Sequence, residues 1–250
     1  MPLGVDGTLR AMALLAGVAV CVNAAELLVR RRDPVLRAIT EGAALDAERG
    51  ALAPLLRPQV FTVLLVLQAI AGVAMIARGA SAWAAVAFVT TVLTAVRWRG
   101  RVNGGADAML ALVLLALAIA PFGGMRLREG AVLLVAAQVT LSYLRAGLAK
   151  ARASGWWQGT ALPAFVALPA YGAPVRFAAG GLAARLLGAG TIIAECLAPL
   201  AWTGPRAALV VVTIAVAFHA GVAWVFGLNR FVFAWGAALP ALLHAGQRAA

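Results

Sequence analysis

The sequence predicts an all-α, polytopic transmembrane helix bundle, and its composition is the first reason. Of the 250 residues, 64% are hydrophobic and only 12% are charged, and the mean hydropathy is +0.94. A soluble domain is nearer half apolar, with about a quarter of its residues charged. A chain of this length cannot hide such an excess in a core, because its surface would still need polar groups. The composition therefore excludes a soluble enzyme, a disordered chain and a fibrous repeat.

Long apolar runs are the second reason, since about 20 helical residues cross the hydrocarbon core of a bilayer. The runs predict about eight spans, of which the third and the last have the weakest pattern: 9–29, 58–77, 81–97, 106–122, 130–149, 182–202, 206–226 and 229–245. The spans must be helices, because backbone polar groups cannot stay unpaired in lipid. A β-barrel would need short alternating strands, and these runs are continuous.

Two connections between the spans are too long to be simple turns. Over 30–57, apolar residues fall on one helical side with charged residues between them, which predicts a short amphipathic helix at the membrane interface. The second connection contains Trp156 and Trp157 and three prolines, Pro163, Pro169 and Pro174. It is too apolar for a solvated loop and too interrupted for a span. We therefore expect a re-entrant or interfacial segment near 150–181, and we look for a site there.

The charge distribution predicts the orientation and the surroundings of the chain. The formal net charge is +12, from 21 basic and 9 acidic residues. With eight spans, 15 of the 21 basic residues fall on one side, which the positive-inside rule assigns to the cytoplasm, with both termini outside. No basic patch interleaved with aromatic residues lies outside the loops, so nucleic acid is not an expected partner. The expected partner is the lipid bilayer, and the expected location is the cell membrane.

The two cysteines, Cys21 and Cys196, lie far apart within apolar runs and form no CxxC pair. We interpret them as small hydrophobic residues packed between helices. No metal site is predicted either, because one histidine and one glutamate within the spans are too few ligands.

Ionisable residues inside spans are costly, so each is a candidate for function. Glu26 lies near the arginines at 30–32, where pairing with an arginine and a functional role are both open. Asp107 opens the fourth span. Capping of the helix N-terminus by its carboxylate is a sufficient explanation for an acidic residue there. Glu195 lies in the middle of a span with no basic residue nearby in the sequence, so it must be neutral, paired across helices or facing water. His219, in the middle of the next span, is either satisfied by a simple hydrogen bond or forms a carboxylate–imidazole pair with Glu195 in one interior. Lys150 is either an interfacial lysine or, if desolvated, a base.

Several of these residues belong to one block of sequence, which is Tyr143-x-x-Ala146-Gly147-x-x-Lys150 followed by Trp156-Trp157-x-Gly159-x-Ala161-Leu162. This block resembles the signature of the HTTM family, the membrane domains related to vitamin K-dependent γ-carboxylase. Weaker blocks follow the family's order: Arg101-x-Asn103-Gly104-Gly105-x-Asp107, Glu195-x-x-x-Pro199-Leu200, Phe218-His219-x-Gly221 and Gly227-Leu228-x-x-Phe231. The resemblance covers most of the chain and implies a single HTTM-like transmembrane domain over 1–250. We expect no extramembrane domain, because the apolar runs fill the chain, and this is a departure from the carboxylase, which carries a large one.

The resemblance also implies a chemistry. In the carboxylase, the lysine that matches Lys150 deprotonates vitamin K hydroquinone, and the oxygenated quinol then removes a γ-proton from a substrate glutamate, to which carbon dioxide adds. It thus implies Lys150, Glu195 and His219 as catalytic residues, a quinol cofactor and a peptide substrate. The candidate substrate-binding residues are Tyr143, Trp156, Trp157 and Asn229. One departure is the predicted orientation, which puts Lys150 on the cytoplasmic side, whereas the animal enzyme works on the lumenal side.

Three functions remain open on the sequence. The first is an HTTM-type membrane enzyme or peptide-maturation factor with a lipid-accessible pocket and Lys150 as the base. The second is a small-solute or proton transporter with Glu195 and His219 as a relay. The third is a non-catalytic membrane partner of a peptide or redox system.

Overall fold

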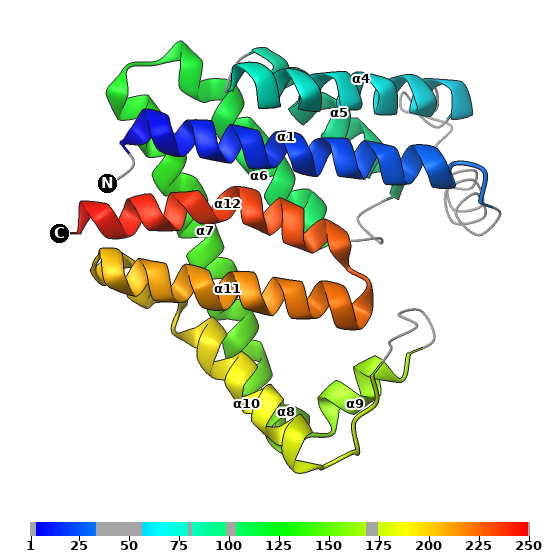
Figure 1. Ribbon diagram of the computed structural model, residues 1–250, viewed down its shortest axis with the longest axis vertical. Helices are drawn as coiled ribbons and strands as arrows, with labels where there is room; N and C mark the ends of the chain where they lie inside the picture. Colours follow the sequence, from blue (N-terminus) through cyan, green and yellow to red (C-terminus); the bar gives the residue numbers. More distant parts are fainter. Residues whose placement is uncertain (1–3, 34–56, 80–81, 99–103, 169–174, 250) are drawn as a thin grey trace. The chain divides into compact units, whose positions relative to one another are not determined.

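The computed structural model describes residues 4–33, 57–79, 82–98, 104–168 and 175–249, and every regular element among them is helical (Figure 1). The amphipathic helix expected over 30–57 lies almost wholly outside the described residues. So do Arg101 and Asn103 of the HTTM-like block, and Pro169 and Pro174. The described helices form two compact units. We call them the N-terminal unit (5–131 with 233–237) and the C-terminal unit (132–232 with 238–249).

The N-terminal unit is an antiparallel set of apolar helices. It contains α1 (Val5–Arg30), α4 (Pro58–Arg78), α5 (Ala82–Trp98), α6 (Gly104–Ile119), the 3-10 helix η3 (Ala120–Phe122) and the first turns of α7 (Met125–Arg152). Helix α1 packs along α4, α4 along α5, and α5 along α6. Figure 1 shows α1 (blue) and α4 (cyan) side by side. A Cβ atom at Gly72 would lie 2.8 Å from Gly17 O, so these glycines let the two backbones approach closely.

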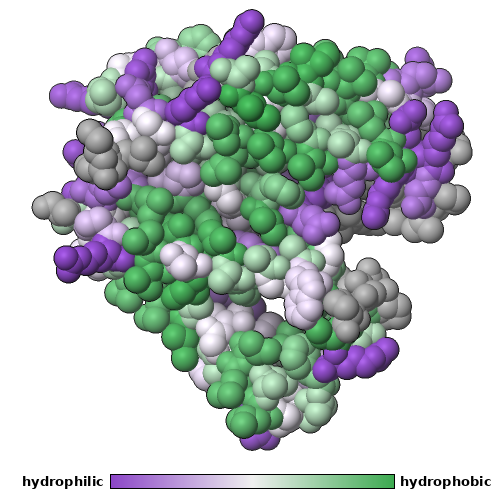
Figure 2. Space-filling model, in the orientation of Figure 1, coloured by the Kyte–Doolittle hydropathy of each residue, from purple (hydrophilic) through white to green (hydrophobic). Residues whose placement is uncertain are grey.

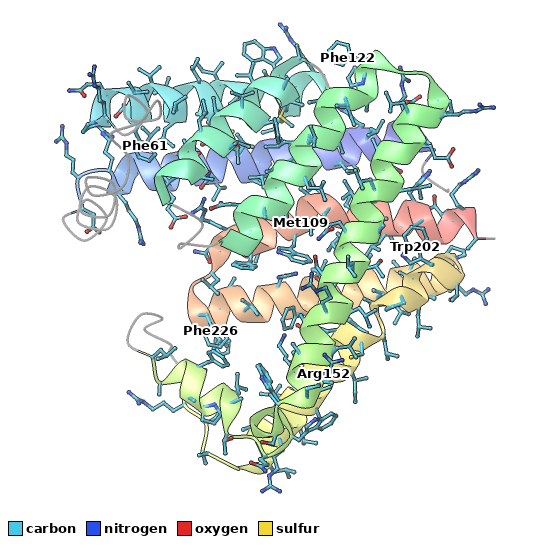
Figure 3. The ribbon with its side chains drawn as sticks, turned by 180° about the vertical axis from the view of Figure 1, so that it is seen from behind. Phe61, Met109, Phe122, Arg152, Trp202 and Phe226 are labelled. Carbon is cyan, nitrogen blue, oxygen red and sulfur yellow. The ribbon has the colours of Figure 1, made fainter. Side chains whose placement is uncertain are left out.

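The C-terminal unit contains the rest of α7 and the remaining helices. These are α8 (Ser154–Trp157), α9 (Ala161–Val166), α10 (Leu182–Cys196), the 3-10 helix η4 (Ala198–Thr203), α11 (Pro205–Phe226) and most of α12 (Asn229–Arg248). Pro199 and Pro205 separate α10, η4 and α11, because proline cannot donate the helical hydrogen bond. The Trp202 indole N–H donates to Thr140 Oγ1 at 2.8 Å, which ties η4 to α7. Figure 3 labels Trp202, just before α11, and Phe226 at its end.

Six helical segments in the described part of the chain are long and apolar enough to cross a membrane, and they confirm six of the eight expected spans. The segments are Val5–Arg30, Pro58–Arg78, Gly105–Phe122, Met125–Arg152, Leu182–Thr203 and Pro205–Phe226. The other two expected spans are also helices. Helix α5 is apolar but has only 17 residues, and α12 carries Arg230, His244 and Arg248 with Pro240 inside it.

Large apolar side chains remain exposed along these segments, as lipid-facing helices require. On α10 and α11 they include Leu186, Leu187, Ile193, Leu209, Val210 and Val216. Figure 2 shows hydrophobic residues over the visible faces of these two helices. The chain is therefore an integral membrane protein with a transmembrane helical bundle.

The segment expected to be interrupted, near 150–181, is interrupted. Helix α7 ends at Arg152, and the two short helices α8 and α9 follow in place of a span. Both pack on α10. At Gly159, φ is +71°, and a Cβ atom there would lie 2.9 Å from Arg185 N, so glycine permits both the left-handed turn and the close approach to α10.

Candidate functional site

One face of α7 carries the residues around which the candidate site is built. Tyr143, Gly147 and Lys150 are spaced four and three residues apart, so they project from the same side of the helix. Tyr143 is buried and Lys150 is partly buried. Lys150 lies in the last turn of α7, where a cation is favoured by the helix dipole.

A close helix contact brings this face against α10. A Cβ atom at Gly147 would lie 2.7 Å from Cys196 Sγ, 2.9 Å from Cys196 N and 3.0 Å from Glu195 Cβ. These distances are too short for any residue larger than glycine without a shift of the backbone. Gly147 therefore sets the approach that puts the end of α7 within reach of Glu195. Cys196 packs in this contact and is a free thiol, as the sequence predicts for a small hydrophobic residue.

Lys150 and Glu195 form a bidentate ion pair. Lys150 Nζ donates to Glu195 Oε1 at 2.9 Å and to Oε2 at 2.7 Å. The Glu195 side chain is 5% exposed and that of Lys150 is 21% exposed. A carboxylate this far from water requires a partner. The partner of Glu195 is thus on another helix: it is Lys150, which lies 45 residues earlier in the chain.

The short helix α8 covers the lysine. Lys150 Nζ lies 5.4 Å from the centre of the Trp156 ring, within the range of a cation–π contact. Trp156 in turn packs against Phe165 of α9, with ring centres 6.0 Å apart. The exposed Trp157 turns away and donates its indole N–H to Ala151 O at 2.8 Å. Trp156 therefore contacts the charged pair, whereas Trp157 fixes α8 to the end of α7.

A second polar contact lies on the same face of α7. Tyr143 OH and His219 Nε2 of α11 share a hydrogen bond of 2.7 Å, and both side chains are buried. Phe218 meets the imidazole edge-on at 5.2 Å, and Phe231 of α12 stacks on it at 6.4 Å. The hydrogen-bond partner of His219 is thus a tyrosine and that of Glu195 is a lysine, whereas one alternative from the sequence was a pair between Glu195 and His219.

A small cavity lies beside these contacts, between α7, α10 and α11. It has a volume of about 10 Å³ and is lined by Tyr143, Glu195, Phe218 and apolar residues of α10 and α11. That volume is close to the minimum for one water molecule. A quinol, the cofactor that the resemblance implies, is too large for this cavity.

The remaining candidate residues lie outside this cluster. Asn229 begins α12 in the C-terminal unit and is exposed. Glu26 in α1 and Asp107 in the first turn of α6 belong to the N-terminal unit, and both are partly buried. The position of Asp107 is the one expected of a residue that stabilises a helix N-terminus. Within the described ranges, no group of three or more metal-ligating side chains comes together.

The composition contains a signal for the site that the sequence analysis overlooked. Lys150 is the only lysine of the chain, and the other 20 of its 21 basic residues are arginines. Counting lysine and arginine together for the orientation concealed this difference. The single lysine is also the residue that the fold places against a buried carboxylate.

Comparison with protein-family models, curated proteins and solved structures finds no match to this chain.

Proposed function

We propose that this chain is a membrane protein of the HTTM type, in which Lys150 and Glu195 exchange a proton while Lys150 acts as the base toward a membrane-bound or lipid-soluble substrate. One observation carries the proposal: the only lysine of the chain donates to both oxygens of a buried glutamate. The HTTM-like blocks add support, because Tyr143, Lys150, Trp156, Glu195 and His219 all come from them and lie in one cluster of contacts.

The choice of lysine at this position favours chemistry over structure. A guanidinium matches a carboxylate better in a bidentate pair, and it cannot be deprotonated in a protein. All the remaining basic residues of the chain are arginines. If the pair served only to hold two helices together, we would expect an arginine at this position too. Lysine is the basic residue that can release its proton and become a nucleophilic or basic amine.

The geometry supports a specific order of proton transfers. In the ion pair, Lys150 is an ammonium and has no lone pair to accept a proton. Transfer of one proton from Nζ to Glu195 Oε2, over 2.7 Å, leaves an uncharged amine and an uncharged carboxylic acid. Loss of both charges favours this state in a medium of low dielectric constant. The amine then takes a proton from an acidic group of the substrate, and the new ammonium stabilises the resulting anion.

Exposure assigns the two residues different places in this scheme. Lys150 is the more exposed partner, so a substrate approaches Lys150, and Glu195 stays behind it as the proton acceptor. The Trp156 ring beside the ammonium offers a flat apolar surface for that substrate. Because Tyr143 lines the same cavity as Glu195, the Tyr143–His219 contact borders the proton acceptor.

The decisive variant is Lys150→Arg, which keeps the charge and the bidentate geometry but removes the base. The assay compares a native-host strain that lacks the gene with its parent and scores any defect caused by the deletion. We expect the Lys150→Arg protein to accumulate in the membrane like the wild type and to fail to correct that defect. The matched control is Arg152→Lys, the same exchange in reverse, one half-turn further along the chain and outside the pair. Full restoration by Lys150→Arg at normal abundance would contradict the proposal and leave the pair a structural role.

A further inference from the structure

A polar cavity of the N-terminal unit lies where several of its helices end. Its volume is about 220 Å³, and it is lined by the start of α1, the end of α4, η3 and the first turn of α7: Asp6, Leu9, Arg10, Arg78, Gly79, Ala120, Pro121 and Arg128. Since α1, α4 and α7 are membrane-spanning candidates, their ends mark the level of the lipid headgroups. Three arginines and one aspartate give this cavity a net charge of +2.

Two of the arginines are held in place by groups of the protein. Arg10 Nη2 donates to Ile76 O at 3.1 Å and to Ala77 O at 3.3 Å, the last carbonyls of α4 that lack a helical partner. Gly79 has φ +78°, and a Cβ atom there would lie 2.8 Å from Arg10 Nη1, so glycine keeps the space for this guanidinium. Arg128 Nη1 donates to Asp6 Oδ1 at 3.0 Å in an exposed ion pair.

The third arginine, Arg78, has a different status. It is the last residue of α4, and its side chain makes no hydrogen bond or ion pair with another residue in the described ranges. It therefore adds a third positive charge to a cavity that two other guanidinium groups already line. Such an arrangement is unfavourable unless an anion or water compensates the charges.

The distribution of basic residues along the chain makes this cluster more unusual. The charge count leaves six basic residues on the less basic side of the membrane: Arg10, Arg78, Arg126, Arg128, Arg206 and Arg248. Half of these six line one cavity. The positive-inside rule disfavours arginine on that side, so topology does not explain the cluster.

We infer that this cavity binds a phosphate group. Arginine forks are suited to phosphate oxygens, and a volume of about 220 Å³ holds a small anionic group but lies below the range of pockets for drug-sized ligands, roughly 300–1,000 Å³. Phe122 and Met125, which follow the lining residue Pro121 in the chain, are 81% and 58% exposed. Figure 3 shows Phe122 at the turn between α6 and α7. These apolar side chains beside a basic cavity favour the phosphodiester of an anionic lipid, while free phosphate has the same binding chemistry.

The test uses the full chain in detergent micelles and measures the shift in the midpoint of thermal unfolding. The probes are phosphatidylglycerol, phosphatidylcholine with the same acyl chains, and inorganic phosphate. We expect phosphatidylglycerol to raise the midpoint by a few degrees when it is in about tenfold excess over its dissociation constant. Arg78→Gln should weaken this binding about tenfold, because it removes one charged hydrogen-bond donor.

Arg126→Gln is the matched control, since Arg126 is exposed, lies on the same side and does not line the cavity. It should bind phosphatidylglycerol like the wild type. A shift with inorganic phosphate alone, also lost in Arg78→Gln, would support the site and identify free phosphate as the ligand. Equal affinities of the wild type, Arg78→Gln and Arg126→Gln for phosphatidylglycerol would overturn the inference, and so would a wild type that binds neither phosphatidylglycerol nor inorganic phosphate. Direct counting of bound phosphatidylglycerol by native mass spectrometry gives the same answer if unfolding is insensitive.

Discussion

The α1–α4 contact of the N-terminal unit and the α7–α10 contact of the C-terminal unit are built from the same parts. In each, a glycine faces a cysteine of the neighbouring helix: a Cβ atom would lie 2.6 Å from Cys21 Sγ at Gly72, and 2.7 Å from Cys196 Sγ at Gly147. The neighbouring residues differ. Gly147 is followed by Lys150 and Cys196 is preceded by Glu195, which form a buried ion pair, whereas Ile76 and Val20 surround the other contact.

The difference shows how function can be separated from packing in a bundle of this kind. Small residues at helix crossings are the ordinary way to bring transmembrane helices together. A close crossing is therefore no evidence of a site by itself. The α7–α10 crossing becomes a candidate site because it holds a charged pair that a pure packing contact has no need of. Three kinds of variant test this difference: changes of the ion pair in the C-terminal unit, changes of the glycine in each contact, and removal of one buried hydrogen bond in each unit.

The largest expected effect comes from breaking the ion pair on one side only. Lys150→Ala leaves Glu195 buried without its partner, and loss of one member of a buried pair costs roughly 3–5 kcal/mol. We expect a value near the lower end, about 3 kcal/mol, because Lys150 is partly exposed. Unfolding in mixed micelles measures this free energy. The double variant Lys150→Met with Glu195→Leu should recover most of it, since an apolar pair of similar volume needs no compensation. A double variant as unstable as Lys150→Ala would show that the charges themselves hold the helices.

The two glycines are expected to have intermediate and similar effects on stability. Gly147→Ala and Gly72→Ala each introduce a methyl group closer than 3.0 Å to backbone or sulfur atoms, and overpacking of this kind costs about 1–3 kcal/mol. Their effects on function should differ. Gly147→Ala moves α7 away from Glu195 and should reduce complementation of the deletion strain when compared at equal amounts of folded protein. Gly72→Ala should leave this complementation unchanged. Equal functional losses at matched abundance would remove the distinction between the two contacts.

The smallest effects are expected from the buried hydrogen bonds. Tyr143→Phe removes the 2.7 Å contact with His219, and Thr91→Val removes the 2.7 Å bond that Gln68 donates from α4 to α5. Interhelical hydrogen bonds in membranes contribute roughly 0.6 kcal/mol and at most about 1.7 kcal/mol. Both variants should therefore lower the free energy of unfolding by about 1 kcal/mol or less. Only Tyr143→Phe should also reduce complementation. If Tyr143→Phe complements as well as Thr91→Val does, Tyr143 is not part of the site.

The helical membrane fold could be predicted because composition and the length of apolar runs act locally along the chain. The runs at 58–77 and 206–226 correspond to α4 and α11 within a residue of each end. The weakest predictions were the third and last spans, where α5 is short and α12 carries charges and an internal proline. In both, the apolar run is long enough for a helix but does not by itself settle whether that helix crosses the membrane.

The sequence singles out the residues that come together in the cluster around Lys150, but it does not show which of them pair. Glu195 and His219 stood out because the hydrocarbon core tolerates neither without a reason. Which side chain each one meets depends on which helix faces are in contact. That in turn depends on Gly147, a residue whose role is visible only from the atoms of α10 around it. The arginine cavity was missed for a related reason. Its members were counted as signals of orientation, and only the fold brings residues from α1, α4 and α7 together.

The most direct test of the central claim is complementation by the double variant Lys150→Met with Glu195→Leu, measured together with its abundance in the membrane. This protein lacks both charges but is expected to remain folded, because the replacements fill the same space without burying a lone charge. We predict normal abundance and no restoration of the phenotype, since neither remaining side chain can take up or release a proton. Restoration to the wild-type level would contradict the claim that the Lys150–Glu195 pair is kept for proton transfer.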